Sequence, residues 1–571
     1  MLGCKFPRIV FTLFLSLVLV LSHAQILLDG ASFADAGTLS PVVQTVLYSI
    51  TASDLKGNLS FLASDALQGR YTPSFGLDVA AEFIASQFRA AGLEPGGDQD
   101  YFQIATMVDR RLPKMQSDMI VRGGSNALTI PAQSINVLDA SQAAKIEDAT
   151  VLVFPAKDPD LLKNVDITGK AILLAGPPAS KAPRDPSAPG GRKARAFDKA
   201  VASSNAAIEI ELVSQHQPAG DKLLALNEAQ EHHIPVLTVV SDELQRWADH
   251  PDPASTATIS VDIAMPEDHR VTLRNVVGVL RGSDPNLRDT CLLLSAHYDH
   301  LGTTETAGRL AVNRGTSPAD HIYNGANDDG SGTVSVIEIA RALAKLNPHP
   351  RRSVVFLAFF GEERGELGSQ YYARHSIFPL SKTVADINLE QLGRTDATNG
   401  KHINDASFTG YDYSDIPKVF EGAGRETGIH VYMDKDASDL FFIRSDNAAF
   451  AEDGVPAHSV AVAFDFPDYH GLGDRWQKID YENLARVDRM IALGLLTLAN
   501  SAKAPEWNAQ NPKTVPYREA QQRLRSKPSA YLVPQTLPGP QTVPGWFAAG
   551  WRYSARSAIA GSTFAALRAG R

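Results

Sequence analysis

The sequence predicts an α/β protein with a mixed, mostly parallel central sheet flanked by helices, together with a smaller β-rich domain. Three features of the sequence lead to this fold class. Val354–Phe360 is a continuous apolar run, which is typical of a strand buried on both faces of a parallel sheet. From Val271 onward such runs alternate with helical patterns, as they do in α/β domains. Between residues 115 and 270, short apolar runs separated by turns predict the β-rich domain.

Two helices are expected near the start of the main domain. Leucines recur at helical spacing within Thr51–Asp65, and Thr51 or Ser53 can cap this helix. Ser74–Ala91 is a second amphipathic segment, and Gly92 supplies its stop signal. We assign residues 47–114 to a helical N-terminal part of the main domain.

The β-rich domain is expected to contain strands at Ala149–Phe154, Ala171–Ala175 and Ile234–Val240. Within it, Ala179–Arg195 is rich in proline, glycine, lysine and arginine. Because this segment has no interleaved aromatic residues, we interpret it as a solvated, mobile loop and not as a binding site for nucleic acid.

The main domain is expected to continue over residues 271–502. Its predicted strands are Cys291–Ala296, Val354–Phe360, Ala385–Leu389 and Ser459–Phe464. Helical spacing is found at Gly330–Leu346 and in a long final segment capped by Asp480. The proline-rich residues 503–571 fit either an arm packed on the surface or a disordered tail.

Residues 1–24 have the pattern of a secretory signal peptide. Lys5 and Arg8 precede an apolar stretch, and the tripeptide Ser-His-Ala at residues 22–24 resembles a cleavage site. The apolar stretch is short for a membrane anchor, and no other segment is long and apolar enough to cross a bilayer. We therefore expect a periplasmic or extracellular protein with no stable membrane span after cleavage.

Composition narrows the possible functions. The chain has 571 residues, 44% hydrophobic and 21% charged, which fits a soluble protein of two or three domains. Its formal net charge of −10 argues against a nucleic-acid-binding protein, because no basic excess is available to neutralise phosphates. Cys4 leaves with the signal peptide, and Cys291 is expected to be buried and inert, so the mature protein should have no disulfide.

Ionisable side chains follow the four predicted strands and lie in the glycine-rich turn between the first two. They are His297, Glu362, Glu363, Glu390 and His470, with Asp328 and Asp329 in the turn. Taken singly, each has a plain structural explanation, such as a helix cap or a surface turn. Together they would meet at one sheet edge, where buried acids repel one another unless cations are present. Imidazoles with carboxylates suit zinc or another first-row ion, and this number of ligands suits two ions sharing one bridging carboxylate.

Five motifs resemble, in order and spacing, those of the co-catalytic dizinc aminopeptidases, a family of secreted leucyl-type aminopeptidases with glutamate carboxypeptidases as relatives. They are Ala296-His-Tyr-Asp-His300, Gly325-Ala-Asn-Asp-Asp-Gly-Ser-Gly332, Phe360-Gly-Glu-Glu363, Ile387-Asn-Leu-Glu390 and Asp468-Tyr-His470. The resemblance covers residues 272–500 closely and 47–105 more loosely. It implies a zinc-exopeptidase-like fold in which residues 115–270 are an inserted protease-associated domain.

By position, the resemblance also implies two zinc ions per chain. His297 and Glu390 would hold one ion. Glu363 and His470 would hold the other, and Asp328 would bridge the two. One ligand departs from the family pattern, because the family usually has aspartate at the position of Glu390.

The resemblance implies further roles around these ligands. Glu362 would be the general base, and Asp299 would hydrogen-bond the imidazole of His297. The Asp328–Asp329 peptide is at the position where the family often has a cis bond. Leu301–Ile322 is a long insertion that is expected to form a rim loop over the site.

The predicted function is a zinc-dependent exopeptidase acting on peptides, with an aminopeptidase as the leading interpretation. A carboxypeptidase would need a cation to grip the substrate carboxylate, and Arg394, Arg444 and Arg475 are candidates that surface ion pairs explain as well. A glutaminyl cyclase uses a related core with one zinc ion, and the full ligand set argues against it. A metal-free receptor-like relative should have lost ligands, and none is missing. Side-chain specificity would depend on the loops around Phe441-Phe442 and Tyr469.

Overall fold

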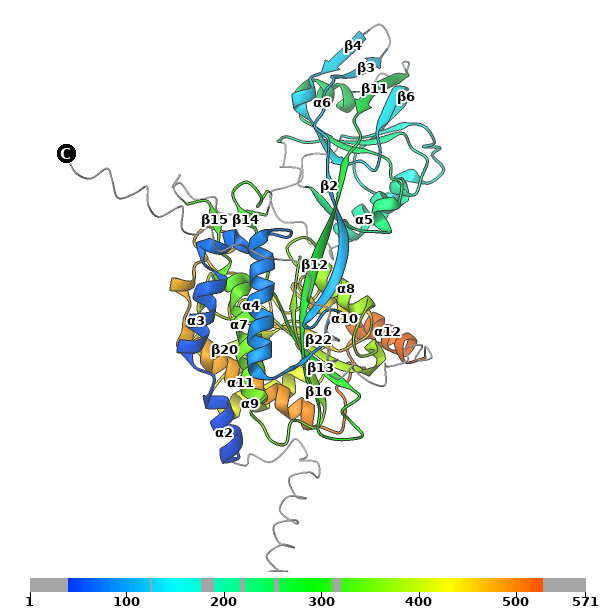
Figure 1. The fold of residues 1–571 in the computed structure, drawn as a ribbon. Helices are drawn as coiled ribbons and strands as arrows, with labels where there is room; N and C mark the ends of the chain where they lie inside the picture. The colour runs from blue at the N-terminus through cyan, green and yellow to red at the C-terminus, as the bar shows by residue number, and fades with distance from the viewer. Residues whose placement is uncertain are drawn as a thin grey trace, which may run out of the picture. The chain divides into compact units, whose positions relative to one another are not determined.

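The computed structural model describes residues 39–123, 126–175, 189–215, 221–250, 256–308, 310–311 and 320–526 (Figure 1). The segment predicted as a signal peptide, and residues 527–571 of the predicted tail, lie outside these ranges. Within the described ranges, every helix is too short or too polar to cross a membrane.

A ten-stranded mixed sheet forms the centre of the main domain. Its strands are β1 (Glu94–Pro95), β2 (Phe102–Arg111), β9 (Lys222–Ala225), β12 (Glu267–Leu280), β13 (Cys291–His297), β16 (Ser353–Phe359), β17 (Thr383–Leu389), β20 (Asp405–Phe408), β21 (His430–Tyr432) and β22 (Ala457–Ala461). They lie in the order β21-β20-β22-β17-β13-β16-β12-β2-β9, with β1 paired to β12. The central strands β16, β13, β17 and β22 are parallel, whereas β12, β2 and β9 add antiparallel pairs on one side. The predicted mixed α/β architecture is confirmed, with its parallel part at the centre.

The central strands are buried on both faces, as their apolar sequences predict. Every residue of β13 and β16 is buried, and successive side chains enter two different hydrophobic clusters on opposite faces. Cys291 begins β13 as a buried free thiol, and burial raises its pKa to about 12. The predicted strand Ser459–Phe464 is shifted, because β22 ends at Ala461 and the following residues already lead into the loop before His470.

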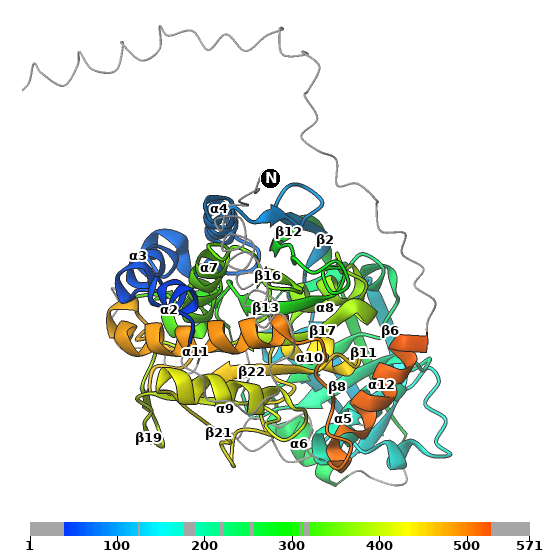
Figure 2. The same ribbon diagram turned by 90° about the horizontal axis from the view of Figure 1, so that it is seen from below.

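Helices cover both faces of this sheet (Figure 2). One face packs against α2 (Pro41–Tyr48), α3 (Ala52–Leu62), α4 (Phe75–Ala91), α7 (Gly332–Leu343), α9 (Ile416–Thr427) and α11 (Tyr481–Asn500). The other packs against α8 (Leu367–Arg374), α10 (Asn447–Glu452) and α12 (Val515–Ser526). Both N-terminal helices match the prediction, since Thr51 caps α3, Ser74 caps α4, and Gly92 ends α4 with a φ of +79°.

The first part of the predicted tail packs on the main domain. Trp507 is buried, and its indole Nε1 donates a hydrogen bond to the carbonyl oxygen of Gly454 at 3.0 Å. Its ring stacks on Tyr517 of α12, with centroids 5.2 Å apart. Of the two interpretations of residues 503–571, the packed arm therefore applies up to Ser526.

A second, eight-stranded sheet lies in the segment predicted to be β-rich. Its strands are β3 (Met119–Gly123), β4 (Asn126–Ile130), β5 (Ile135–Asp139), β6 (Ala144–Phe154), β7 (Ala171–Leu174), β8 (Ile208–Leu212), β10 (Val236–Val239) and β11 (Ala257–Ile263), with helices α5 (Pro189–Ala202) and α6 (Asp242–Asp249). This sheet has hydrophobic clusters of its own. The three strands predicted here are present, and the assignment to the protease-associated domains stays a prediction.

One prediction in this segment is wrong. Residues 189–195 of the predicted mobile loop Ala179–Arg195 are helical, because α5 begins at Pro189. Proline suits the first turn of a helix, and Phe197 and Val201, one turn apart, are fully buried against β7. The apolar residues that hold the helix therefore lie just beyond the stretch whose composition suggested a loop. Residues 179–188 lie outside the described ranges.

Candidate metal centre

The carboxyl ends of three parallel strands bring the predicted ligands together. His297 ends β13 and lies opposite Phe359, the last residue of β16. Glu362 and Glu363 follow β16 after a sharp turn, and Glu390 comes directly after β17. Because parallel strands in register end at the same sheet edge, these side chains lie side by side.

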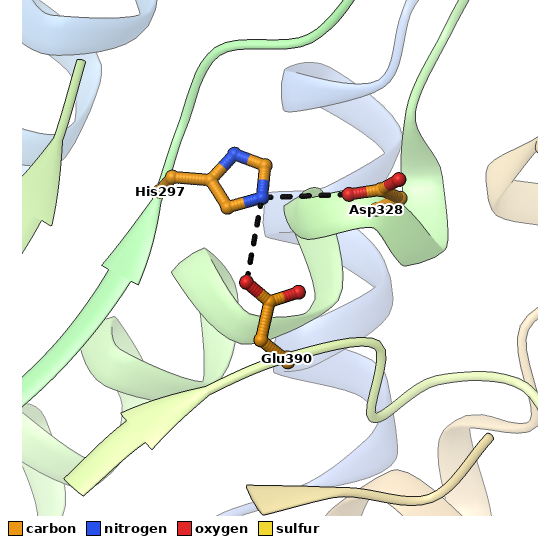
Figure 3. A group of neighbouring side chains, drawn as sticks. All are labelled: His297, Asp328 and Glu390. Atoms are coloured by element: carbon orange, nitrogen blue, oxygen red, sulfur yellow. Dashed lines mark ion pairs between the residues drawn. The ribbon is translucent and has the colours of Figure 1, made fainter. Parts of the chain in front are cut away.

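A first group consists of His297, Asp328 and Glu390, all of them buried (Figure 3). The Nε2 atom of His297 lies 3.4 Å from Oδ1 of Asp328 and 3.7 Å from Oε1 of Glu390. One potential ligand atom from each residue lies within 4.8 Å of the others. Figure 3 shows the imidazole and both carboxylates turned toward a shared centre.

A second group shares Asp328 with the first and contains His300, Glu363 and His470. The Nε2 atom of His470 lies 3.2 Å from Oδ2 of Asp328 and 3.3 Å from Oε2 of Glu363. Nδ1 of His300 lies 2.8 Å from the other oxygen of Glu363, Oε1. Asp328 thus presents one oxygen to each group, which is the arrangement that a bridging carboxylate requires.

Asp328 is held in this position by its own turn. It lies within a π-helical turn, Ala326–Ser331, and the Asp328–Asp329 peptide is cis. The carboxylate of Asp474 accepts hydrogen bonds from the backbone N–H groups of Asn327 and Asp328, at 2.9–3.1 Å. The side chain of Asp328 therefore projects from a backbone fixed by a buried acid.

Two of the imidazoles are oriented by carbonyl oxygens. Nδ1 of His297 is hydrogen-bonded to the backbone oxygen of Asp299 at 3.3 Å, and Nδ1 of His470 to that of Leu310 at 3.0 Å. Toward a carbonyl oxygen Nδ1 can act only as a donor, so a neutral ring keeps its lone pair on Nε2. In both histidines Nε2 is the atom that faces the carboxylates. The contact with Leu310 also brings the long segment Leu301–Ile322 to the site, although residues 309 and 312–319 of it lie outside the described ranges.

Asp299 connects His297 to the turn that carries Glu362. Its carboxylate Oδ1 lies 3.6 Å from Nδ1 of His297, and the ring N–H donates instead to the backbone oxygen of Asp299. The same carboxylate accepts hydrogen bonds from the hydroxyl of Thr72 at 3.0 Å and from the backbone N–H of Glu362 at 3.1 Å. Asp299 therefore fixes the spacing between the end of β13 and the turn after β16.

Glu390, the predicted ligand at which the sequence departs from the family pattern, is held by a chain of polar groups. The hydroxyl of Ser445 donates to Oε1 of Glu390 at 2.5 Å. Asn388 donates to that hydroxyl at 2.8 Å and accepts a hydrogen bond from Ser295 at 3.2 Å. All four side chains are buried. The longer glutamate is thus given a defined orientation that its own flexible chain would not provide.

The pKa values differ sharply among the three glutamates. Burial would raise the pKa of Glu363, but the charge of His470 and hydrogen bonds from His300 and His470 lower it to about 2. Burial raises the pKa of Glu390 to about 7, because the attraction of His297 offsets it only in part. Burial also raises the pKa of Glu362 well above its usual range, and the charges of Glu363 and Glu390 add to that shift. Such crowding of buried acids favours a site that gains positive charge from a bound cation.

The buried polar atoms of the two groups fit metal ions better than they fit one another. Among the described residues, Oδ2 of Asp328 and Nε2 of His300 are buried without a hydrogen bond, whereas Nδ1 of His300 contacts Oε1 of Glu363 at 2.8 Å. Unpaired buried polar atoms are costly and uncommon in folded proteins. Nitrogen and oxygen donors that converge in this way are the donor set of zinc or another first-row ion. The residues present therefore fit two such ions sharing Asp328.

A cleft of about 220 Å³ opens over the two groups. Its lining includes Glu362, Tyr469 and an aromatic wall made by Phe441 and Phe464, whose rings stack with centroids 5.1 Å apart. Phe442, the neighbour of Phe441, instead lies in the hydrophobic core. Of the two phenylalanines expected near the pocket, the first lines it and the second anchors the loop.

The three arginines considered as substrate grips have different partners. Arg394 is buried and forms ion pairs with Asp396 and Asp468 at 2.6 and 2.8 Å. Arg475 pairs with Asp320 at 2.6 Å. For these two the explanation as ion-pair partners holds, whereas Arg444 lines the cleft.

Three contributors to the site were not assigned from the sequence: His300, Ser445 and Asp474. His300 carried a signal, because it belongs to the motif that also contains His297. Ser445 and Asp474 are separated from the groups they support by 55 and 146 residues, and no local pattern marks them.

Comparisons with known proteins agree with this geometry. The sequence model of Peptidase family M28 matches residues 275–494. A probable leucine aminopeptidase 2 from Aspergillus oryzae is 26% identical over 333 residues, which are 53% of this chain and 60% of that protein. A probable zinc metalloprotease from Pyrenophora tritici-repentis is 31% identical over 171 residues, which are 28% of this chain and 35% of that protein. The chain thus spans less than two thirds of the length of these relatives.

The fold has a counterpart among solved structures. An aminopeptidase from Aneurinibacillus sp. strain AM-1 aligns with a TM-score of 0.52 and 18% identity, covering 79% of this chain and 95% of that one. At 18% identity this alignment shows that the two folds are similar. The match to the family model shows similarity in sequence. All the side chains of both groups lie within the matched segment. Residues 275–494 of the chain therefore match Peptidase family M28.

Proposed function

We propose that this protein is a zinc-dependent aminopeptidase that removes N-terminal residues from peptides. The observation that carries the proposal is the pair of donor groups that share Asp328 beside a cleft lined by Glu362. The names of the relatives, a leucine aminopeptidase and a zinc metalloprotease, support the choice of reaction and ion.

In this proposal each group holds one ion. His297 and Glu390 would hold the first, and Glu363 and His470 would hold the second. Asp328 would serve both groups. His300 contacts the remaining oxygen of Glu363 and keeps that carboxylate oriented.

Glu362 carries the proton transfers. When bound, two zinc ions supply Lewis acidity that polarises the scissile carbonyl and lowers the pKa of the attacking water. The carboxylate of Glu362 takes the proton from the nucleophile and passes it to the leaving amine. Asp299 positions this turn through the backbone N–H of Glu362.

The charge of the cleft favours an amino-terminal substrate. Glu362, Glu390 and Asp465 line it, and carboxylates attract the free ammonium group of a peptide N-terminus. Two of the three arginines that a carboxypeptidase could use are already paired within the chain. The complete ligand set is also more than a glutaminyl cyclase with one zinc ion would need, and it gives no support to a metal-free receptor-like role.

We further propose that the protein is exported to the periplasm or the exterior. The n-region, apolar stretch and cleavage-like tripeptide of residues 1–24 support this proposal. The resemblance to the dizinc aminopeptidases supports an inserted protease-associated domain in residues 115–270.

Glu362→Gln tests the catalytic assignment. The amide keeps the shape of the side chain but cannot accept the proton, so we expect turnover of leucyl nitroanilide to fall by about 10²–10⁴-fold. Metal content, measured by mass spectrometry, should stay at the wild-type value. Glu482→Gln on the exposed face of α11 is the matched control and should retain full activity. A Glu362→Gln variant with normal turnover would show that another group is the base.

A substrate panel tests the reaction class. Aminoacyl nitroanilides and peptides with blocked N-termini should be assayed side by side, with and without a chelator. We expect hydrolysis only of substrates with a free N-terminus, lost on chelation and restored by zinc. Activity that survives complete removal of metal would refute the zinc-dependent mechanism.

A further inference from the structure

Arg444 stands apart from the rest of the cleft in its charge. Among the described residues that line the cleft it is the only lysine or arginine, whereas Glu362, Glu390 and Asp465 are acidic. We propose that Arg444 binds a carboxylate of the substrate, so that the enzyme favours peptides with an acidic group close to the N-terminus. This inference deepens the proposed aminopeptidase function and rests on it.

The guanidinium of Arg444 is held against the aromatic wall. Its Cζ lies 4.9 Å from the centre of the Phe441 ring, and that ring stacks in turn on Phe464 at an interplanar angle of 5°. A stacked guanidinium keeps its N–H groups free in the plane for a bidentate contact with a carboxylate. The stack therefore orients the cation without using up its hydrogen-bond donors.

The loop that carries this stack is anchored at several points. Phe442 packs against Tyr413 and Trp507 in the core, with ring centroids 4.6 and 6.4 Å away. The side chain of Asn447 donates to the carbonyl oxygen of Phe442 at 2.8 Å. Arg444 thus projects from a fixed loop, and a preorganised group loses less entropy on binding.

Arg444 has no acidic partner within the described part of the chain, in contrast to other arginines near the site. Arg394 and Arg475 each form ion pairs at 2.6 Å. No carboxylate oxygen of a described residue lies within 4.0 Å of the Arg444 guanidinium, although acids are abundant in the same cleft. A cation left unpaired among acids is available to a carboxylate that arrives with the substrate.

The location of Arg444 places that carboxylate near the scissile bond. Arg444 directly precedes Ser445, whose hydroxyl donates to Glu390 of the metal centre. Without Arg444 the acidic cleft would repel a negatively charged substrate. A carboxylate so close to the N-terminus of the substrate can come from the side chain of an Asp or Glu residue, or from the free C-terminus of a dipeptide.

Two matched pairs of substrates distinguish these sources. Leu-Glu-amide against Leu-Gln-amide tests the side chain, and free Leu-Gln against Leu-Gln-amide tests the C-terminal carboxylate. In the zinc-loaded wild-type enzyme we expect kcat/KM to favour the charged member of at least one pair by roughly tenfold, chiefly through a lower KM. The pair that shows the preference identifies the source.

Variants then assign the preference to Arg444. Arg444→Gln should reduce the charged-to-neutral ratio of kcat/KM to about one, and Arg444→Glu should invert it. Because the ratio cancels the fraction of folded enzyme, it is not sensitive to a loss of stability. Arg425→Gln, at an exposed arginine of α9, is the matched control and should keep the wild-type ratio.

The outcomes separate this inference from the proposed function. Hydrolysis of Leu-Gln-amide with no preference in either pair, or a preference that survives in Arg444→Gln, would overturn the role of Arg444 and leave the aminopeptidase assignment intact. Failure of the zinc-loaded wild type to hydrolyse any of the three substrates would overturn the aminopeptidase function itself, and the inference with it.

Discussion

Two buried histidines of the central sheet have opposite surroundings. His297 ends β13 and faces the carboxylates of the metal centre, with Asp328 at 3.4 Å. His458 lies in β22, separated from β13 by a single strand, and its ring contacts the hydroxyl of Ser414 at 2.6 Å and the carbonyl oxygen of Thr409 at 2.7 Å. Both side chains are fully or almost fully buried.

Their pKa values move in opposite directions. Burial lowers the pKa of His458 to about 4, because no acid offsets the loss of water. Burial has the same tendency at His297, but the charges of Glu362 and its acidic neighbours outweigh it and raise the pKa well above the usual range. A buried histidine is therefore not by itself a sign of a functional site; the acids that gather around it are.

Replacing His297 should have the largest effect on activity. It would test whether this histidine, unlike His458, belongs to the metal centre. His297→Ala removes the imidazole of the first group, so we expect kcat/KM for leucyl nitroanilide to fall by at least about 10³-fold and bound zinc to decrease. Activity assays and metal analysis by mass spectrometry measure both. A fully active, fully zinc-loaded variant would exclude His297 from the metal centre.

His458 should affect the stability of the protein in acid but not its peptidase activity. Its pKa is about 4 in the folded protein and about 6.5 when unfolded, so the unfolded state takes up the proton first as the pH falls. Stability is fully retained above pH 6.5 and should fall by about 3 kcal/mol as the pH drops to 4. Urea unfolding across this range would measure the loss.

His458→Gln is the variant that isolates this effect from other groups that titrate in acid. It should show a shallower pH dependence between 6.5 and 4 than the wild type, while retaining zinc and most of the activity. If the two pH profiles were parallel, His458 would not be the group responsible. Loss of zinc in this variant would break the contrast with His297.

Ser445→Ala should produce a smaller change than loss of a ligand. The variant frees Oε1 of Glu390 from its hydrogen bond, and loss of such a supporting contact typically weakens metal binding by about 10–100-fold. Zinc titration against a competing chelator would measure the affinity. Ser445→Thr keeps the hydroxyl and should restore most of it, whereas equal loss in both variants would point to packing.

The grouping of the candidate metal ligands could be predicted from the sequence for a simple reason. His297, Glu363 and Glu390 each follow a buried strand, and a parallel register brings strand ends together whatever the intervening chain does. The motif order supplied Asp328 and His470. Burial of the strands could also be predicted from the sequence. Every residue of β13 and β16 is apolar or a serine, except His297 at the end of β13.

The supporting contacts needed the fold. Ser445 reaches Glu390 across 55 residues, and Asp474 reaches Asp328 across 146, distances over which no periodicity carries information. The fate of the three candidate arginines also depended on partners far away in the sequence, as Arg394 with Asp468 illustrates. The helix α5 was missed because its buried residues follow a stretch whose composition alone suggested a loop.

Strands β2 and β12 pair over ten consecutive positions, from Phe102 opposite Val276 to Arg111 opposite Glu267. The chain thus departs on one strand and returns on its immediate partner, and residues 112–266 occupy the place of a hairpin turn. A deletion of residues 112–266 that joins β2 to β12 by a short turn is therefore expected to leave the pairing of these two strands in place. The deletion would remove β9 from the sheet edge and leave the strand order around the candidate metal centre as it is.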